Sequence, residues 1–155
     1  SIPDRILDLW FALFKRHPEI QFQILTKRPE RAKEYFDMRF MPDNCWIGTS
    51  VGIQEAKPRI DILRGIHTAP IRFISFEPLL EDLGELNLYD IDWVIIGGES
   101  DKKHPRPMKA EWAENILNQA RNWGSAVWFK QMGGIGGDGA GGDLLNGRRI
   151  QEMPK

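Results

Sequence analysis

The sequence predicts an α/β fold with five parallel strands joined by helical crossovers. Short apolar runs alternate along the chain with segments whose apolar residues recur at helical spacing. Strands that are separated by helices pair in parallel through right-handed crossovers. The runs are continuously apolar rather than alternating with polar residues, which is typical of strands buried on both faces of a sheet.

The first predicted element is an amphipathic helix at the start of the chain. Apolar residues recur at helical spacing in this segment. The predicted helices span residues 1–17, 31–40, 54–66 and 110–123. The predicted strands span residues 22–26, 45–51, 71–76, 92–96 and 126–129. The segment 79–89 lies between the third and fourth strands and has no convincing helical period.

We expect one domain, in which residues 1–132 carry the strands and helices and residues 133–155 form a glycine-rich loop and a C-terminal tail. Seven of the ten residues from 133 to 142 are glycine. Glycine weakens both helices and strands, so the sequence predicts a mobile loop there, followed by a polar tail on the surface. This loop is not a phosphate-binding Walker loop, because no Gly-Lys-Ser/Thr follows it.

Composition excludes several classes of protein. The 155 residues carry 21 Lys and Arg against 22 Asp and Glu, which gives a net charge of −1. This charge excludes a broad basic face for duplex nucleic acid, but it does not exclude a local basic pocket. Cys45 is the single cysteine, which excludes an internal disulfide and a cysteine-built zinc or iron–sulfur site in this chain. We expect it to be a buried apolar residue. No apolar run approaches the roughly 18 residues of a membrane span, so we expect a cytoplasmic protein without membrane contact.

Every predicted strand ends in polar residues. In parallel α/β folds, ligands bind at the carboxyl ends of the strands, so these residues predict a ligand-binding rim. No catalytic role is assigned to any of them, and no metal ligand is expected. The predicted ligand-binding residues are Thr26, Lys27, Arg28, Ser50, Glu77, Glu99, Arg106, Lys130 and Gln131.

Several charged members of this set have both a ligand-binding and a structural interpretation. Glu77 either accepts a hydrogen bond from a ligand, or acts as a base, or forms an ion pair with Lys130 or Lys27. Glu99 follows two glycines, which allow a ligand to approach the backbone closely. Lys27 and Arg28 either bind a carboxylate or phosphate or form the solvated start of a helix.

Several motifs together point to a family. They are residues 22–31, 46–51, 73–80, 92–100, 106–108, 129–131, 145–148 and 152–154. In order and spacing they resemble the phage-associated family of uncharacterised proteins called Gp-thirty-seven/Gp-sixty-eight, whose members look like radical S-adenosylmethionine proteins. The resemblance implies S-adenosylmethionine and an iron–sulfur cluster as cofactors of the intact protein, with the cluster held by a three-cysteine motif in its N-terminal part. Because those cysteines are missing, the chain resembles the C-terminal portion only and has no cofactor of its own.

The strand count agrees with a partial barrel. A complete (β/α)₈ barrel takes roughly 250 residues, or about 31 per unit, so this chain amounts to about five units. We therefore expect an incomplete TIM-type (β/α) barrel with two unpaired edges and one exposed apolar face. Such edges predict self-association or pairing with a missing N-terminal half.

Three functions follow from these observations. The first is the C-terminal part of a radical S-adenosylmethionine-like protein, which supplies substrate or adenosyl contacts at the rim and is inactive alone. The second is a non-catalytic module that binds a nucleotide or phosphate ligand. The third is a scaffold that pairs through its sheet edges. The expected partner at the rim is a small-molecule or nucleotide ligand, and a nucleic acid is the alternative.

Overall fold

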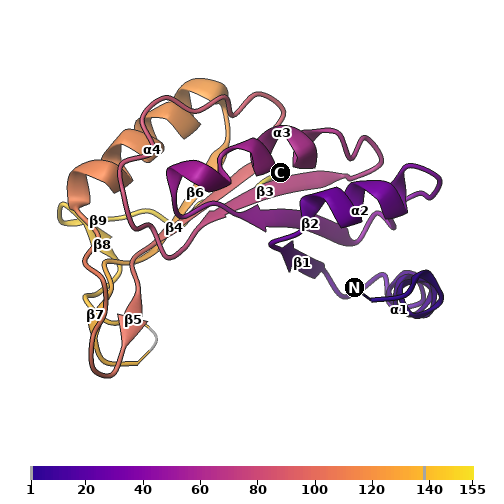
Figure 1. Ribbon diagram of the computed structural model, residues 1–155, viewed down its shortest axis with the longest axis horizontal. Coiled ribbons are helices and arrows are strands. Elements are labelled where there is room, and N and C mark those ends of the chain that lie inside the picture. The colour runs from indigo at the N-terminus through magenta and orange to yellow at the C-terminus, as the bar shows by residue number, and fades with distance from the viewer. Residues whose placement is uncertain (1, 138) are drawn as a thin grey trace.

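Five parallel strands form one open sheet in a computed structural model that describes residues 2–137 and 139–155. Its strands are β1 (Phe22–Thr26), β2 (Cys45–Ser50), β3 (Ile71–Phe76), β4 (Trp93–Gly97) and β6 (Ala126–Gln131). The strand order is β1-β2-β3-β4-β6, so each strand lies beside the one before it. The five parallel strands predicted from the sequence are therefore confirmed. The sheet does not close into a barrel (Figure 1).

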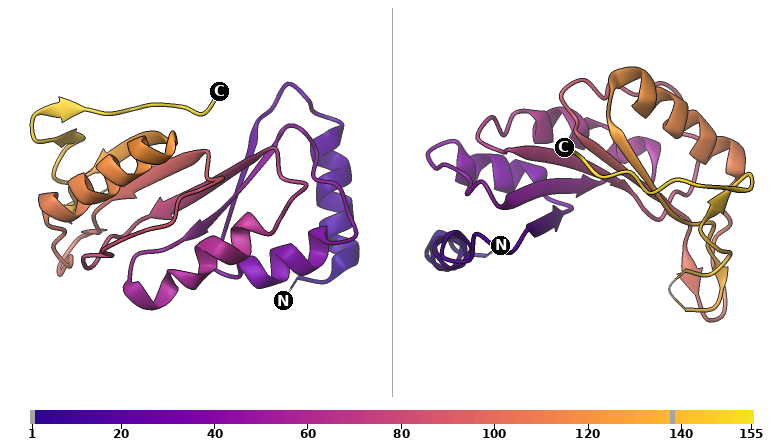
Figure 2. Two further views of the ribbon diagram at one scale, coloured as in Figure 1. Left: turned by 90° about the horizontal axis from the view of Figure 1, so that it is seen from above. Right: turned by 180° about the vertical axis from the view of Figure 1, so that it is seen from behind.

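The helices that connect the strands lie together on one face of the sheet (Figures 1 and 2). Right-handed crossovers between successive neighbouring strands place every connecting helix on the same side. The connecting helices are α2 (Pro29–Phe36), a 3₁₀ turn η1 (Gln54–Ala56), α3 (Pro58–Arg64) and α4 (Ala110–Trp123). Helix α1 (Asp4–Lys15) precedes β1 and connects no strands. The predicted helix over 54–66 is thus divided, and α3 starts at its proline. No helix connects β3 and β4, where an irregular segment buries Leu79, Leu83 and Leu88 instead.

The hydrophobic core lies between the sheet and these helices. Alternate strand residues that point toward the helices are fully buried, among them Ile74, Phe76, Val94 and Phe129. The opposite face has no helical layer, and Leu25 on that face is 52% exposed. The expectation of strands buried on both faces holds for the central strands, where Phe73, Ser75 and Trp93 of this second face are buried. It is wrong for β1, because all connecting helices lie on the first face and leave Leu25 exposed. We call this second face the inner face.

The two edges of the sheet differ. At the β6 edge, Phe129 N donates to Ile150 O and Glu152 N donates to Val127 O, each at 2.8 Å. The C-terminal segment thus pairs with β6 in an antiparallel sense. The expectation of two unpaired edges is wrong here, because a short distant segment covers one of them. At the other end of the sheet, β1 has β2 as its one strand neighbour among the described residues.

An arm extends from the sheet on the side away from α2, α3 and α4 (Figure 1). It contains β5 (Ser100–Asp101) and β7 (Gly134–Ile135), which pair in parallel. Gly134 and Ile135 of the glycine-rich segment thus form a short strand that its composition does not predict. Asp138 of this segment lies outside the described residues. Strands β8 (Leu144–Leu145) and β9 (Arg148–Arg149) form a hairpin beyond it. Within the described chain, none of the helices has the length and apolar character needed to cross a membrane.

Candidate functional site

A cavity of about 610 Å³ opens at the carboxyl ends of the strands, and we call it the rim pocket. It gathers most of the residues that the sequence predicts for a ligand site. Lys130 and Gln131 contact one of its lining residues, Glu77. The predicted residues that line it are Lys27, Ser50, Glu77, Glu99 and Arg106. The structure thus brings together all of the predicted site except Thr26 and Arg28.

Glu77 has one fixed carboxylate oxygen. Its Oε1 accepts hydrogen bonds from Lys130 Nζ at 2.9 Å and from Gln131 Nε2 at 2.8 Å. Gln131 is buried, and its Nε2 also donates to Gly98 O at 2.9 Å. No described residue donates to Glu77 Oε2, and the side chain is 24% exposed. The ion pair that the sequence offered as an alternative for Glu77 is therefore present, and it leaves the second oxygen available to a ligand.

Backbone contacts hold the loop after Glu77 in place. Leu79 N donates to Gly97 O at 2.9 Å, and Leu80 N donates to Gly52 O at 3.0 Å. A Cβ atom at Gly52 would lie 2.1 Å from Pro78 O, so a side chain there would force the two loops apart. The position of Glu77 is thus set by close backbone packing between the β2 and β3 loops.

Glu99 binds Arg106 rather than solvent. Its Oε2 accepts from the Arg106 backbone N at 2.8 Å and from Nε at 2.9 Å, and its Oε1 accepts from Nη2. The hydrogen bond from the Arg106 side chain lowers the pKa of Glu99 to about 2. A carboxylate held ionised in this way is a poor proton acceptor near neutral pH. Glu99 therefore holds the ends of the loop 99–106 together at the start of the arm. The same contacts position the Arg106 side chain.

Two cations in the rim pocket have no carboxylate partner in the part of the chain that the structure describes. They are Lys27, which is exposed, and Arg59, whose Nη1 donates to Ser50 O at 2.9 Å. By contrast, Lys130 and Arg106 are both paired. Unpaired cations in a concave site attract anions. Sequence reasoning missed Arg59, although its place at the start of the helix after β2 puts it at the rim end.

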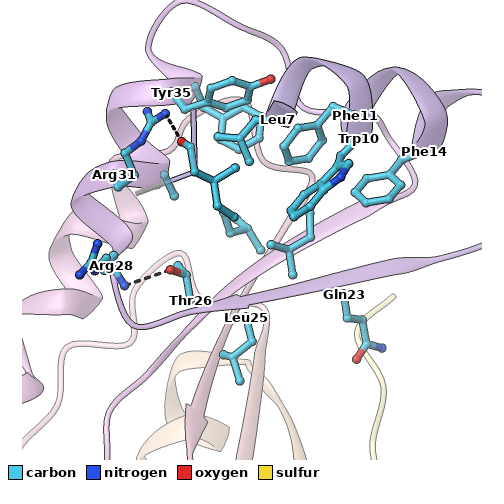
Figure 3. Close-up of a pocket in the computed structure, with 15 residues that line it drawn as sticks. Leu7, Trp10, Phe11, Phe14, Gln23, Leu25, Thr26, Arg28, Arg31 and Tyr35 are labelled. Atoms are coloured by element: carbon cyan, nitrogen blue, oxygen red, sulfur yellow. Dashed lines mark hydrogen bonds between the residues drawn. The ribbon is translucent and has the colours of Figure 1, made fainter. Parts of the chain in front are cut away.

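Thr26 and Arg28 lie outside the rim pocket. Arg28 N donates to Thr26 Oγ1 at 3.0 Å, and both line a separate groove of about 450 Å³ beside β1 (Figure 3). The groove is largely apolar, and we call it the α1 groove. Its residues from α1 are Leu7, Trp10, Phe11 and Phe14. Helix α1 has an apolar side, yet none of its residues is buried.

The described residues do not form a ligand set for an iron–sulfur cluster. Cys45 is fully buried in β2, and burial raises the pKa of its thiol to about 11. Its burial as an apolar residue was predicted. Within residues 2–137 and 139–155, no three His, Cys, Asp or Glu side chains are close enough together to hold a metal ion.

Comparison with known proteins identifies the family. A family model described as a protein of unknown function, DUF5131, matches residues 1–154. The chain belongs to this family. No curated protein and no solved structure matches it. DUF5131 is an uncharacterised family, as the motifs predicted, and its description names no activity.

Proposed function

We propose that this DUF5131 chain is the C-terminal part of a phage-associated, radical S-adenosylmethionine-like protein with an incomplete TIM-type barrel. Its rim pocket supplies substrate or adenosyl contacts. The observation that carries the proposal is the state of Glu77 at the carboxyl ends of the strands. One of its oxygens is fixed by Lys130 and Gln131, and the other receives no hydrogen bond from the described residues.

The side chains of the rim pocket select the chemistry of the ligand. Glu77 Oε2 accepts a hydrogen bond from a hydroxyl or amino group. Lys27 and Arg59 attract a carboxylate or a phosphate, because no described carboxylate neutralises them. The ligand is therefore a small molecule that carries both an anionic group and a hydrogen-bond donor.

The role of this chain is to bind and orient that ligand. An iron–sulfur cluster would need ligands that this chain does not supply, since Cys45 is buried in the sheet. No chemical step is therefore assigned to these residues. The chain on its own binds its ligand without transforming it.

Calorimetric titration tests the proposal. The ligands are S-adenosylmethionine and a panel of hydroxylated carboxylates and phosphates. We expect Glu77→Gln to weaken the binding of any ligand found by roughly tenfold to a hundredfold, because a charge-assisted hydrogen bond contributes about 1.5–3 kcal/mol. Glu85→Gln, an exposed position outside the pocket, is the matched control. Binding that is equal in the wild type and in Glu77→Gln would overturn the proposal.

A second function is favoured by the α1 groove. We infer that the β1 edge pairs with a further strand, because α1 has an apolar side without a single buried residue and β1 has one strand neighbour among the described residues. Sedimentation velocity over a range of concentrations and the binding of an apolar dye test this scaffold role. We expect Trp10→Gln to reduce both association and dye binding, whereas Trp123→Gln on α4 changes neither. A monomer at all concentrations that binds no dye would rule it out.

A further inference from the structure

The rim pocket borders a second cavity on the inner face of the sheet. This inner cavity has a volume of about 710 Å³. Glu77 lines both cavities, so the two meet at the Glu77–Lys130 ion pair. Together they form one site with two different ends, and the inner end is mostly apolar.

Aromatic side chains form the floor of the inner cavity. Phe73 and Trp93 are buried against each other with ring centroids 5.7 Å apart, and Trp93 Nε1 is fixed by a hydrogen bond to Glu152 O at 2.9 Å. Trp128 packs edge-on against Trp93 at 6.4 Å and is half-buried. Strand register places Ile95 beside Trp128 on the same face. The buried rings therefore support Trp128, whose own ring is partly open to a ligand.

Polar groups are found where the floor reaches the rim. Ser75 lies next to Ile95 on the inner face, and Glu77 and Lys130 follow at the carboxyl end of the cavity. Beyond Glu77, the rim pocket holds the unpaired cations Lys27 and Arg59. The order along the site is thus an aromatic floor, a hydrogen-bond acceptor and a cationic end.

We propose that these two adjoining cavities together bind a nucleoside phosphate, either free or as the terminal unit of an oligonucleotide. The inference rests on the proposed function of the rim pocket and names its ligand class. The planar base packs on Trp128 and Ile95, because any base presents a flat face for stacking. A sugar hydroxyl donates to Glu77 Oε2, and the phosphate lies at Lys27 and Arg59. The cavity volumes fall in the range of about 300–1,000 Å³ that is usual for small-molecule sites.

Titration calorimetry with a graded set of ligands tests this inference. The probes are the four common nucleoside 5′-monophosphates, their nucleosides, ribose 5-phosphate, inorganic phosphate and a 5′-phosphorylated dinucleotide. We expect at least one monophosphate to bind roughly tenfold more tightly than both its nucleoside and ribose 5-phosphate, because the nucleoside lacks the phosphate contacts and ribose 5-phosphate lacks base stacking. The dinucleotide distinguishes a free nucleotide from a strand end, because tighter binding of the dinucleotide identifies the strand end.

Variants separate the two ends of the site. Trp128→Leu should weaken monophosphate binding by roughly fivefold to a hundredfold and leave ribose 5-phosphate unchanged, whereas Trp128→Phe should retain binding. Lys27→Gln should weaken the monophosphate but not the nucleoside. Trp123→Leu and Lys15→Gln, both on exposed helix positions, are the matched controls. Circular dichroism melting checks that each variant is folded.

The outcomes distinguish this inference from the proposed function. Suppose that ligands bind in a Glu77-dependent manner but Trp128→Leu has no effect, or that ribose 5-phosphate binds as well as the monophosphates. In either case the assignment of a nucleoside phosphate as the ligand is wrong, and the proposed function of the rim pocket stands. If a carboxylate ligand binds through Glu77 and no phosphate does, the inference fails in the same way. If none of the ligands binds, both proposals fail.

Discussion

Lys130 Nζ lies 2.9 Å from Glu77 Oε1, although 53 positions separate the two residues in the sequence. The contact joins the ends of β3 and β6, which are not neighbours in the sheet, since β4 lies between them. It also marks the meeting point of the rim pocket and the inner cavity. The ion pair therefore fixes an acceptor at the centre of the candidate site.

Loss of the Lys130 charge should affect binding more than folding. We expect Lys130→Gln to weaken the binding of an anionic ligand by about fivefold to tenfold, because Glu77 would then repel it without a neutralising partner. The free energy of unfolding should change by less than about 1 kcal/mol, since both side chains are partly exposed. Calorimetry and urea denaturation measure the two effects, with Lys109→Gln as the control. A large loss of stability with unchanged binding would contradict this role.

The Glu99–Arg106 contact should resist acid. The pKa of Glu99 is lowered from 4.5 to about 2, foremost by the hydrogen bond from the Arg106 side chain. Because the pKa is depressed in the folded state, the contribution of this pair to stability is complete above about pH 4.5 and is lost as the pH falls toward 2. Carboxyl ¹³C NMR should give a midpoint near 2, and Arg106→Gln should move it back toward 4.5. A midpoint near 4.5 in the unmodified chain would show that the loop is open.

Asn44 should be a strong determinant of stability. Its Nδ2 carries two hydrogens and lies 2.8–3.0 Å from three backbone carbonyls at the C-terminal end of α1 and in the loop beyond it, those of Phe14, His17 and Ile20. Asn44→Ala leaves these carbonyls without that donor, and we expect a loss of about 1–3 kcal/mol in the free energy of unfolding. Asn122→Ala, an exposed change on α4, should cost less than about 0.5 kcal/mol. Equal losses for the two variants would mean that Asn44 does not hold α1.

The Cys45 thiol should be unreactive in the folded chain. It is fully buried, and burial raises its pKa to about 11, so almost no thiolate forms at pH 8. We expect a thiol-specific disulfide reagent to react roughly a hundredfold more slowly with the native chain than with the chain in guanidinium chloride. Rapid labelling of the native chain would contradict the burial of β2.

The chain alone should not cleave S-adenosylmethionine. The described residues supply no group of ligands for a cluster. We expect that incubation with S-adenosylmethionine, iron, sulfide and a strong reductant yields no 5′-deoxyadenosine by liquid chromatography. Its appearance above a control with Cys45→Ala would show that the chain holds a cluster after all.

Local patterns were enough to predict the five strands of the main sheet, but not the short strands β5, β7, β8 and β9. The predicted strand Ile71–Phe76 matches β3 in full. Its six mostly apolar residues form a clear segment, which Glu77 and Pro78 follow directly. The polar residues at the strand ends likewise predicted most of the rim pocket, since parallel strands bring their carboxyl ends to one edge.

Long-range pairing could not be predicted in the same way. Ile150 and Glu152 pair with β6 through backbone atoms, and this short polar segment carries no strand pattern. The pairing of Gly134 with Ser100 could not be predicted either, because the glycine-rich composition around Gly134 carries no strand pattern. Arg59 was missed because the sequence alone does not distinguish a cation that lines a site at the start of a helix from one that is merely solvated. The position of the neighbouring loops makes that distinction.

The most direct test of the rim as the ligand site is an NMR titration of the ¹⁵N-labelled chain with the tightest ligand of the calorimetric panel. We predict that the backbone amide shifts concentrate in Lys27, Gly52, Glu77, Gly98 and Lys130 and their neighbours, around the rim pocket. Shifts that concentrate instead along α1 and α2, around the α1 groove, would contradict the account.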